Sequence, residues 1–290
     1  MCSMVFFHRN NGLGSKFICL SRSVSYRAYS DFLIPDRLGK YHALIGRAID
    51  GGYQFHSLIE FWQHLQSETL SSEQKCIVLR HDVDADSKTA RRMWELELRR
   101  GVQSSYYFRK STLDIPLMQE IQASGCEASY HYEELATLAR KKGFTRREQI
   151  EAVMPHLREL FRENLHSLRE ATGLPMLTVA SHGDFINRKL GIPNHEMLKD
   201  DHLRRELNVV LEAYDSQLMQ HVTTRCSDSR YPPFWSHGDP EDAIFRGEKR
   251  LYILIHPRQW HASVWLNLKD DTVRCWEGLS YWRAAHRHSQ

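Results

Sequence analysis

Short apolar runs, each ending in a polar cluster, recur along the chain. Each run is rich in residues typical of buried β-strands, and the polar cluster falls at its carboxyl end. Charged groups placed at the ends of buried strands lie at the rim of a sheet, where catalytic groups of α/β proteins collect. The runs and their clusters are Ile77–Leu79 with Arg80–Asp84, Cys126–Tyr130 with His131–Glu134, Leu177–Ala180 with Ser181–Asp184, and Leu251–Ile255 with His256–Pro257.

Helical patterns separate most of these runs. Asp86 or Ser87 can cap a helix whose apolar positions repeat at helical spacing up to Gly101. Pro155 should bend a later helix or mark its first turn. Further helices are predicted over 41–48, 57–65 and 116–123, up to Lys142, and from a capping box at Thr145–Glu148 to Gly173; further strands are predicted over 104–108, 208–212 and 221–226.

Alternating strands and helices with short linkers imply parallel pairing of the strands. The polar clusters would then converge on one face of the sheet. About seven parallel strands with helices outside predict an α/β fold, a distorted (β/α) barrel rather than a doubly wound sheet.

The composition favours one catalytic domain. No linker, repeat or low-complexity tract divides the 290 residues, so we predict an N-terminal extension over 1–38 and a catalytic domain over 39–290. The net charge of +3 is nearly neutral for this length, and no nucleic-acid partner is expected. The six cysteines form no Cys-x-x-Cys pair, which excludes a zinc ribbon and a dithiol redox motif.

Targeting signals are weak in this chain. No apolar run approaches the roughly 18–20 residues of a membrane span, and the first 22 residues lack a signal-peptide core. A cytoplasmic location is therefore expected. An organellar leader and a disordered extension both stay open for the Arg/Ser-rich start.

Three of the motifs resemble those of the NodB-type polysaccharide deacetylase family of carbohydrate esterases. The similar segments are Arg80–Asp84, Tyr130–Glu134, and Leu254–His256 followed by Pro257 and Trp260, while Ser105–Arg109 looks like the family's second strand. The likeness spans about residues 70–265 and is closest to the divergent branch associated with cell-surface glycan biosynthesis. It implies a distorted barrel, a carbohydrate substrate and hydrolysis of an N- or O-acyl group, with acetyl the first candidate. It also implies a divalent metal, with zinc the first candidate.

Two departures from the family pattern affect the expected metal site. Val83 splits the usual Asp-Asp pair, and Leu135 stands where a second histidine would follow His131. Asp82 and Asp84, at i and i+2 of an extended strand, would still point to the same side. The third ligand could be His182, Glu133 or Glu134; His182 is preferred because it follows another strand and precedes Gly183.

Hydrolysis of an amide or ester needs a metal ion, a base and an acid. Asp82 is predicted as the base, matching the family's first aspartate, and Asp84 and His131 are predicted as metal ligands with His182 as the preferred third. His256 is predicted as the acid. The residues predicted to bind substrate are His81, Glu133, Asp228 and Trp260, with Asp228 alternatively orienting His256 and Trp235 a further aromatic platform.

Each prediction has a structural alternative. Asp84 could cap the following helix, His182 could be a turn histidine, and Glu133 and Glu134 could be first-turn acids. The tryptophans could serve packing alone. At the level of function, the alternatives are a metal-independent amidohydrolase on the same barrel and a non-catalytic glycan-binding domain. The chain has no Gly-x-Ser-x-Gly elbow, phosphate loop or dinucleotide fingerprint, which argues against serine hydrolases, kinases and nicotinamide enzymes.

Overall fold

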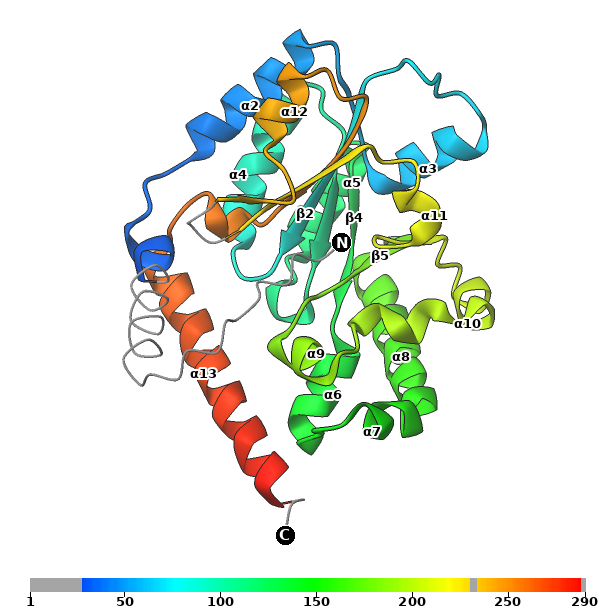
Figure 1. Ribbon diagram of the computed structural model, residues 1–290, viewed down its shortest axis with the longest axis vertical. Coiled ribbons are helices and arrows are strands. Elements are labelled where there is room, and N and C mark those ends of the chain that lie inside the picture. Colours follow the sequence, from blue (N-terminus) through cyan, green and yellow to red (C-terminus); the bar gives the residue numbers. More distant parts are fainter. Residues whose placement is uncertain (1–27, 230–233, 288–290) are drawn as a thin grey trace, which may run out of the picture.

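Nine strands form one mostly parallel sheet in residues 28–229 and 234–287, which the computed structural model describes (Figure 1). Along the sheet the strands follow the order β6-β5-β4-β3-β2-β9-β7-β8, and β1 pairs with the first half of β2. All pairs are parallel except β7 with β8. The strands are β1 Gln54–His56, β2 Cys76–Val83, β3 Ser105–Phe108, β4 Glu127–Tyr132, β5 Thr178–Ser181, β6 Leu211–Glu212, β7 Thr224–Asp228, β8 Trp235–Ser236 and β9 Arg250–Ile255.

Helices surround the strands, with α2 and α4 toward one side and α6 and α8 toward the other (Figure 1). Within the described residues β6 and β8 end the path without pairing with each other, so the barrel is open. The predicted α/β fold with a distorted barrel is confirmed. The helices are α2 Leu38–Asp50, α3 Leu58–Gln66, α4 Ser87–Leu98, α5 Ile115–Ala123, α6 Glu134–Lys142, α7 Arg147–Ala152, α8 Met154–Thr172, α9 Phe185–Leu190, α10 Asp201–Glu206, α11 Ser216–Met219, α12 Pro240–Phe245 and α13 Val264–Arg287, with short turns η1 Tyr29–Leu33, η2 Lys110–Thr112, η3 Asn194–Lys199 and η4 Pro257–Gln259.

Strand β2 lies at the centre of the sheet, and all eight of its residues are buried. In the sheet register, Asp82 pairs with Tyr107 of β3, His81 with Ile255 of β9, and His131 with Ala180. Because these strands are parallel, their carboxyl ends meet at one edge. The register therefore brings the four polar clusters of the sequence to the same edge.

Three predictions about where helices begin and end can be compared with the structure. Asp86 caps α4, since its carboxylate accepts from the Thr89 amide. The predicted helix up to Gly173 is wrong as a single element: it is divided into α7 and α8 at Val153, and Pro155 occupies the first turn of α8. The Thr145–Glu148 capping box does not form either, because the Gln149 side chain accepts the amides of both Thr145 and Arg146.

The C-terminal helix α13 was not predicted. It packs against α6 through Tyr281, whose hydroxyl donates to the Phe144 carbonyl, and it approaches Gly143 closely. A Cβ at Gly143 would lie 2.4 Å from the Ala284 backbone, and the φ of +68° is one that glycine adopts without strain. Of the predicted N-terminal extension over 1–38, residues 1–27 lie outside the described part of the chain. Helix α2 begins at Leu38, next to the predicted boundary.

Candidate active site

Five predicted side chains converge at the carboxyl edge of the sheet. Asp82 and Asp84 end β2, His131 lies on β4, His182 follows β5, and His256 follows β9. The Nε2 atom of His131 lies 3.5 Å from Asp82 Oδ2 and 3.3 Å from Asp84 Oδ1. The two aspartates therefore face the same histidine, as their i, i+2 spacing predicts.

Asp84 lies at the centre of a group that could hold a metal ion. Its Oδ1 atom is 3.3 Å from His131 Nε2 and 3.6 Å from His182 Nε2. That oxygen is buried and accepts no hydrogen bond from any described residue. Burial alone would raise the pKa of Asp84, but His182 and His131 outweigh it and hold the pKa well below its usual range. An ionised, buried carboxylate oxygen facing two imidazoles offers a binding position for a cation.

An oxygen lies behind each histidine ring, and among the described residues His131 alone of the two forms a hydrogen bond there. His131 Nδ1 donates to the Ala180 carbonyl at 2.9 Å, which leaves Nε2 as the free ligand atom. His182 Nδ1 faces Glu133 Oε2 at 3.3 Å, and its Nε2 faces Asp84. Glu133 in turn accepts three hydrogen bonds from the Arg109 guanidinium. Carboxylate or carbonyl partners of this kind fix the ring and the tautomer of metal-binding histidines.

The three groups fit a divalent metal such as zinc. One ligand atom each from Asp84, His131 and His182 lies within 4.8 Å of the others. Tetrahedral zinc with bonds of about 2.0–2.1 Å holds neighbouring ligand atoms about 3.3–3.4 Å apart, close to the 3.3 and 3.6 Å seen from Asp84. Three protein ligands of this type leave a position open, as in hydrolytic sites.

Asp82 has a different environment from Asp84. Both of its oxygens accept from Arg80, Oδ1 from Nε at 2.7 Å and Oδ2 from Nη2 at 2.8 Å. Arg80 is fully buried and also lies 4.6 Å from the centre of the Tyr214 ring. Burial would raise the pKa of Asp82, but Arg80 and then His131 outweigh it and lower the pKa. Asp82 is therefore ionised and fixed, while Asp84 is ionised and without a hydrogen-bond donor at Oδ1.

His256 forms a pair with Asp228. The imidazole Nδ1 lies 2.5 Å from Asp228 Oδ1, and the His256 amide donates to Oδ2 at 2.8 Å. Trp260 donates its indole N–H to the same Oδ2 at 2.8 Å. Burial would lower the pKa of His256, but Asp228, with Asp84 and Asp82 further away, raises it to about 9. The ring is protonated at neutral pH, and 24% of its side chain is exposed.

Two predicted substrate contacts are corrected by the structure. His81 is fully buried, stacks on Tyr106 and contacts Tyr41 and Glu97, so it cannot reach a substrate. Residues alternate along a strand, and His81 therefore points away from the edge that Asp82 faces. Trp260 is 2% exposed and holds Asp228 instead of offering a platform.

The structure also distinguishes the remaining side chains that the sequence offered for the site. Glu134 accepts from Tyr130 and Asn164 inside the core and does not join the cluster. Glu133 lies beside His182, in the pocket wall. Trp235 packs edge-on against Phe234 and Trp260.

A pocket of about 870 Å³ opens onto this edge of the sheet. Asp84, His182, Asp228 and His256 line it, and α13 supplies a wall that includes Lys269 and Glu277. The sequence prediction missed three charged residues of this wall: Arg109, Arg140 and Asp184, of which Arg140 pairs with both Asp184 and Glu277. Arg109 and Asp184 each come shortly after a strand, and that position was a signal in the sequence. Arg140 lies on α6 and had no such signal.

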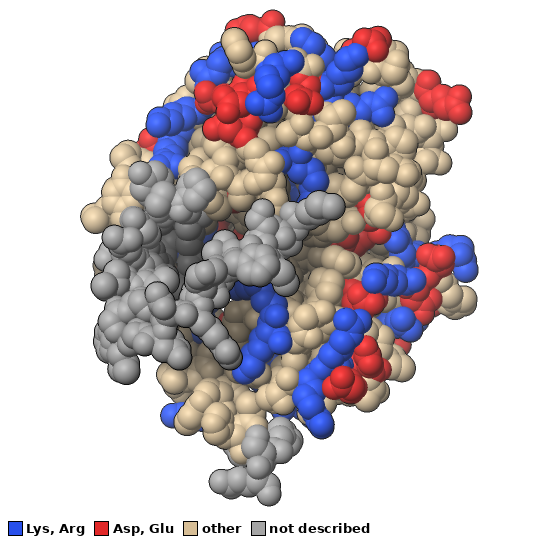
Figure 2. Space-filling model, viewed as in Figure 1, with Lys and Arg blue, Asp and Glu red and all other residues tan. Residues whose placement is uncertain are grey.

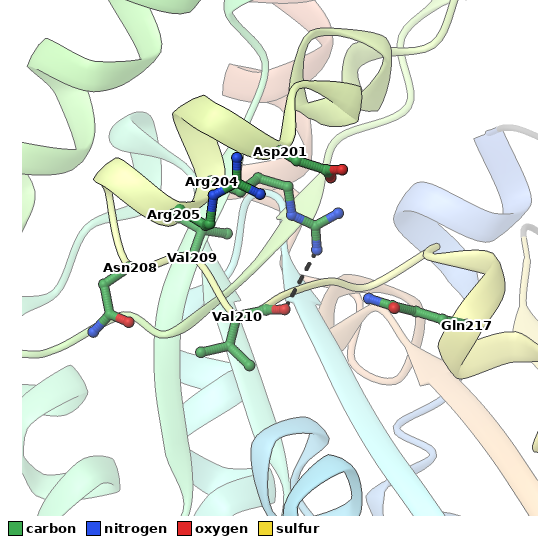
Figure 3. A pocket seen from close by; sticks show the side chains of 7 residues that line it. All are labelled: Asp201, Arg204, Arg205, Asn208, Val209, Val210 and Gln217. Carbon is green, nitrogen blue, oxygen red and sulfur yellow. Dashed lines mark hydrogen bonds between the residues drawn. The ribbon is translucent and has the colours of Figure 1, made fainter. Parts of the chain in front are cut away.

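A second pocket, of about 380 Å³, lies at α10 and β6 (Figure 3). Figure 3 shows Arg204 directed to the Val210 carbonyl, and Arg204 also pairs with Asp215. It contains none of the predicted site residues.

On the face drawn in Figure 2, lysine and arginine alternate with aspartate and glutamate. Among the described residues, no helix is both apolar enough and long enough to cross a bilayer.

Comparison with known proteins finds similarity only among solved structures. No family model matches the chain, and no curated protein matches its sequence. One similar structure is BA3943 from Bacillus anthracis, a CE4 family pseudoenzyme, with 13% identity and a TM-score of 0.36 over 69% of this chain and 63% of that one. Another is the Xyl-CE4 domain of a multidomain xylanase from the hindgut metagenome of Trinervitermes trinervoides, with 14% identity and a TM-score of 0.32 over 69% of this chain and 84% of that domain.

The chain thus covers less than two thirds of the length of the BA3943 structure. At identities and TM-scores this low, the function of the site has to be inferred from its own residues.

Proposed function

We propose that this protein is a metal-dependent hydrolase that removes an N- or O-acyl group, with acetyl the first candidate, from an amino sugar or glycan. The observation that carries the proposal is the unpartnered Oδ1 of Asp84, which faces two oriented imidazoles beside an ionised Asp82 and a protonated His256. A ligand group, a base and an acid are the three parts that amide hydrolysis requires.

The metal would be held by Asp84, His131 and His182. When bound, it would supply a Lewis acid that polarises the acyl carbonyl and favours ionisation of water near neutral pH.

Asp82 acts as the base in this proposal. Its carboxylate is ionised and lies beside the ligand group, 3.5 Å from His131 Nε2. Arg80 fixes both oxygens, so the carboxylate is positioned before the substrate binds. The base accepts the proton of the attacking water.

His256 acts as the acid. A pKa of about 9 keeps the ring protonated at neutral pH, and the Asp228 contact fixes Nδ1 so that Nε2–H is left to donate to the departing amine. Asp228 is thus a positioning residue, which agrees with the alternative role weighed for it in the sequence.

The wall of the pocket suits a polar substrate. Arg109, Arg140, Lys269, Glu133 and Asp270 line it, and these groups can exchange hydrogen bonds with the hydroxyls of a sugar. The volume of about 870 Å³ falls within the range typical of small-molecule sites. We propose a carbohydrate substrate, with Glu133 and Arg109 as contacts.

The test is deacetylation of N-acetylated chito-oligosaccharides by the full chain, followed by detection of the free amine. We expect activity that disappears on chelation and returns on addition of Zn²⁺, Co²⁺ or Ni²⁺. The Asp82→Asn variant should retain the metal and lose activity.

Asp239→Asn is the matched control. Asp239 caps α12, and asparagine caps helices nearly as well as aspartate. Activity that survives complete chelation would support the metal-independent amidohydrolase instead, and turnover of no acylated sugar by a metal-loaded protein would support a glycan-binding role.

A further inference from the structure

A second group of metal-binding side chains lies outside the proposed active site. His56 ends β1, and Glu60 and His64 follow on α3 at intervals of four residues, which places them on one face of the helix. His56 Nδ1 is 3.2 Å from Glu60 Oε2, and His64 Nε2 is 3.9 Å from Glu60 Oε1. One ligand atom from each residue lies within 4.8 Å of the others.

His56 is the unusual member of this group. Its side chain is 7% exposed, yet neither ring nitrogen forms a hydrogen bond with any described residue. The Oε2 of Glu60 is also buried without a hydrogen bond, although His56 Nδ1 lies beside it. Buried polar atoms nearly always form hydrogen bonds. Two neighbouring side chains that face each other with buried polar atoms lacking hydrogen bonds therefore indicate a site for a bound ion.

His64 is oriented by a separate contact. Its Nδ1 lies 2.7 Å from the Thr69 hydroxyl oxygen, which fixes the ring and leaves Nε2 directed at Glu60. This arrangement of one occupied and one free ring nitrogen is typical of histidines that bind metals. The rings of His56 and His64 have centroids 5.1 Å apart in a T-shaped arrangement.

The group is separate from the proposed active site. His56 pairs with Val78, four residues before Asp82 along β2, and none of the three residues lines the 870 Å³ pocket. Glu60 and His64 are 36% and 38% exposed, so an ion can reach the group from solvent.

We propose that His56, Glu60 and His64 bind one divalent transition-metal ion of the zinc class. Two imidazoles and one carboxylate favour Zn²⁺, Co²⁺ or Ni²⁺ over Mg²⁺ and Ca²⁺, which prefer oxygen ligands. The ion would link the end of β1 to two turns of α3 and would bind one ring nitrogen of His56 and a carboxylate oxygen of Glu60. Its expected role is to fasten α3 to the sheet.

The test measures zinc content and thermal unfolding of the full chain after chelation and dialysis against Zn²⁺. We expect His64→Gln to lose one equivalent of zinc per chain relative to its parent, and to lose the rise in melting temperature that added Zn²⁺ gives the parent. His64 is exposed, so this variant should fold. The measurement is repeated in a His131→Ala background, where the loss of one equivalent should be the same.

His202→Gln is the matched control, because His202 and Glu206 form a similar i, i+4 pair at 3.9 Å, but the histidine is 83% exposed and no third ligand joins the pair within the described residues. Its zinc content should equal that of the parent. Unchanged zinc content in His64→Gln, in both backgrounds, would overturn the second site. Loss of zinc in His131→Ala bears only on the proposed active site, so the two proposals fail separately.

Discussion

Replacement of Asp228 by asparagine tests whether the charge of this buried carboxylate makes His256 an acid. The pKa of His256 is raised from 6.5 to about 9, chiefly because Asp228 outweighs the burial that would lower it. That difference corresponds to about 3 kcal/mol, since one pH unit is worth about 1.4 kcal/mol. Asparagine keeps the shape and removes the charge, so the pKa should fall to 6.5 or below.

The effect on rate follows from the protonated fraction. At pH 7.5 that fraction is about 97% for a pKa of 9 and about 9% for a pKa of 6.5, so kcat/KM should fall about tenfold. The loss should shrink as the pH is lowered toward 6, because His256 of the variant becomes protonated there while Asp82 stays ionised. A divalent cation held by Asp84 also repels the imidazolium, so in the loaded enzyme the alkaline limb should lie at or below 9.

The raised pKa of His256 also contributes to the stability of the folded protein. A group with a raised folded pKa stabilises the protein fully below its unfolded pKa of about 6.5, and this contribution is lost as the pH rises toward 9. Asp228→Asn should therefore remove the most stability below about pH 6.5, and progressively less as the pH rises toward 9. Asparagine keeps only one acceptor oxygen, so either the His256 ring nitrogen or the pair of N–H donors from the His256 amide and Trp260 loses its acceptor, at a cost of about 1–3 kcal/mol per unsatisfied group.

The assay is the pH profile of kcat/KM for deacetylation of an N-acetyl amino sugar, from pH 5 to 10, with metal content and melting temperature measured in parallel. Asp239→Asn again serves as the control. An alkaline limb that stays near the parental position, or a loss that is equal at every pH, would refute the assignment of Asp228 to the His256 pKa.

Three further predictions follow from the same edge of the sheet. His131→Ala should lose the active-site metal, measured by elemental analysis; full occupancy would remove His131 from the ligand set. Arg80→Met should destabilise the protein by about 3–5 kcal/mol in urea unfolding, because it leaves the buried Asp82 carboxylate unpaired, and should raise the acid limb of activity as the Asp82 pKa rises; an unchanged limb would show that Arg80 does not set it. His256→Ala should lose on the order of 10²–10⁴ in rate on an N-acetyl amino sugar but much less on an activated aryl acetate, whose leaving group needs no proton; equal losses would exclude the acid role.

The sequence predicted the strand ends of this fold well because each buried strand carries its polar cluster at a fixed position. Asp82, His131, His182 and His256 each follow or end an apolar run, and parallel pairing is enough to bring such ends together. Their exact chemical roles stay predictions.

Other features had no local signal. The alternation that places Asp82 and Asp84 on one side of β2 places His81 on the other, but β2 is buried on both sides, so no polar and apolar alternation marked which side faces the core. Helix α13 was missed because its large apolar residues are exposed, among them Trp265 and Trp276, and do not form a stripe buried against the sheet. The start of α7 at Arg147 depends on the Gln149 side chain, which accepts hydrogen bonds from the Thr145 and Arg146 amides in the folded loop.

The central place of β9 has a consequence for how the molecule folds. Strand β9 lies between β2 and β7, and His256, which directly follows β9, lies at the same edge of the sheet as Asp82 of β2 although 174 residues separate the two in sequence. The strands β3, β4 and β5 follow one another in chain order and can pair through local helical crossovers, whereas β7 and β8 join the sheet only through β9, which pairs with the distant β2. Contacts of such long sequence separation form slowly. Catalytic competence should therefore arise in the final kinetic phase of refolding, after most of the helical signal has returned.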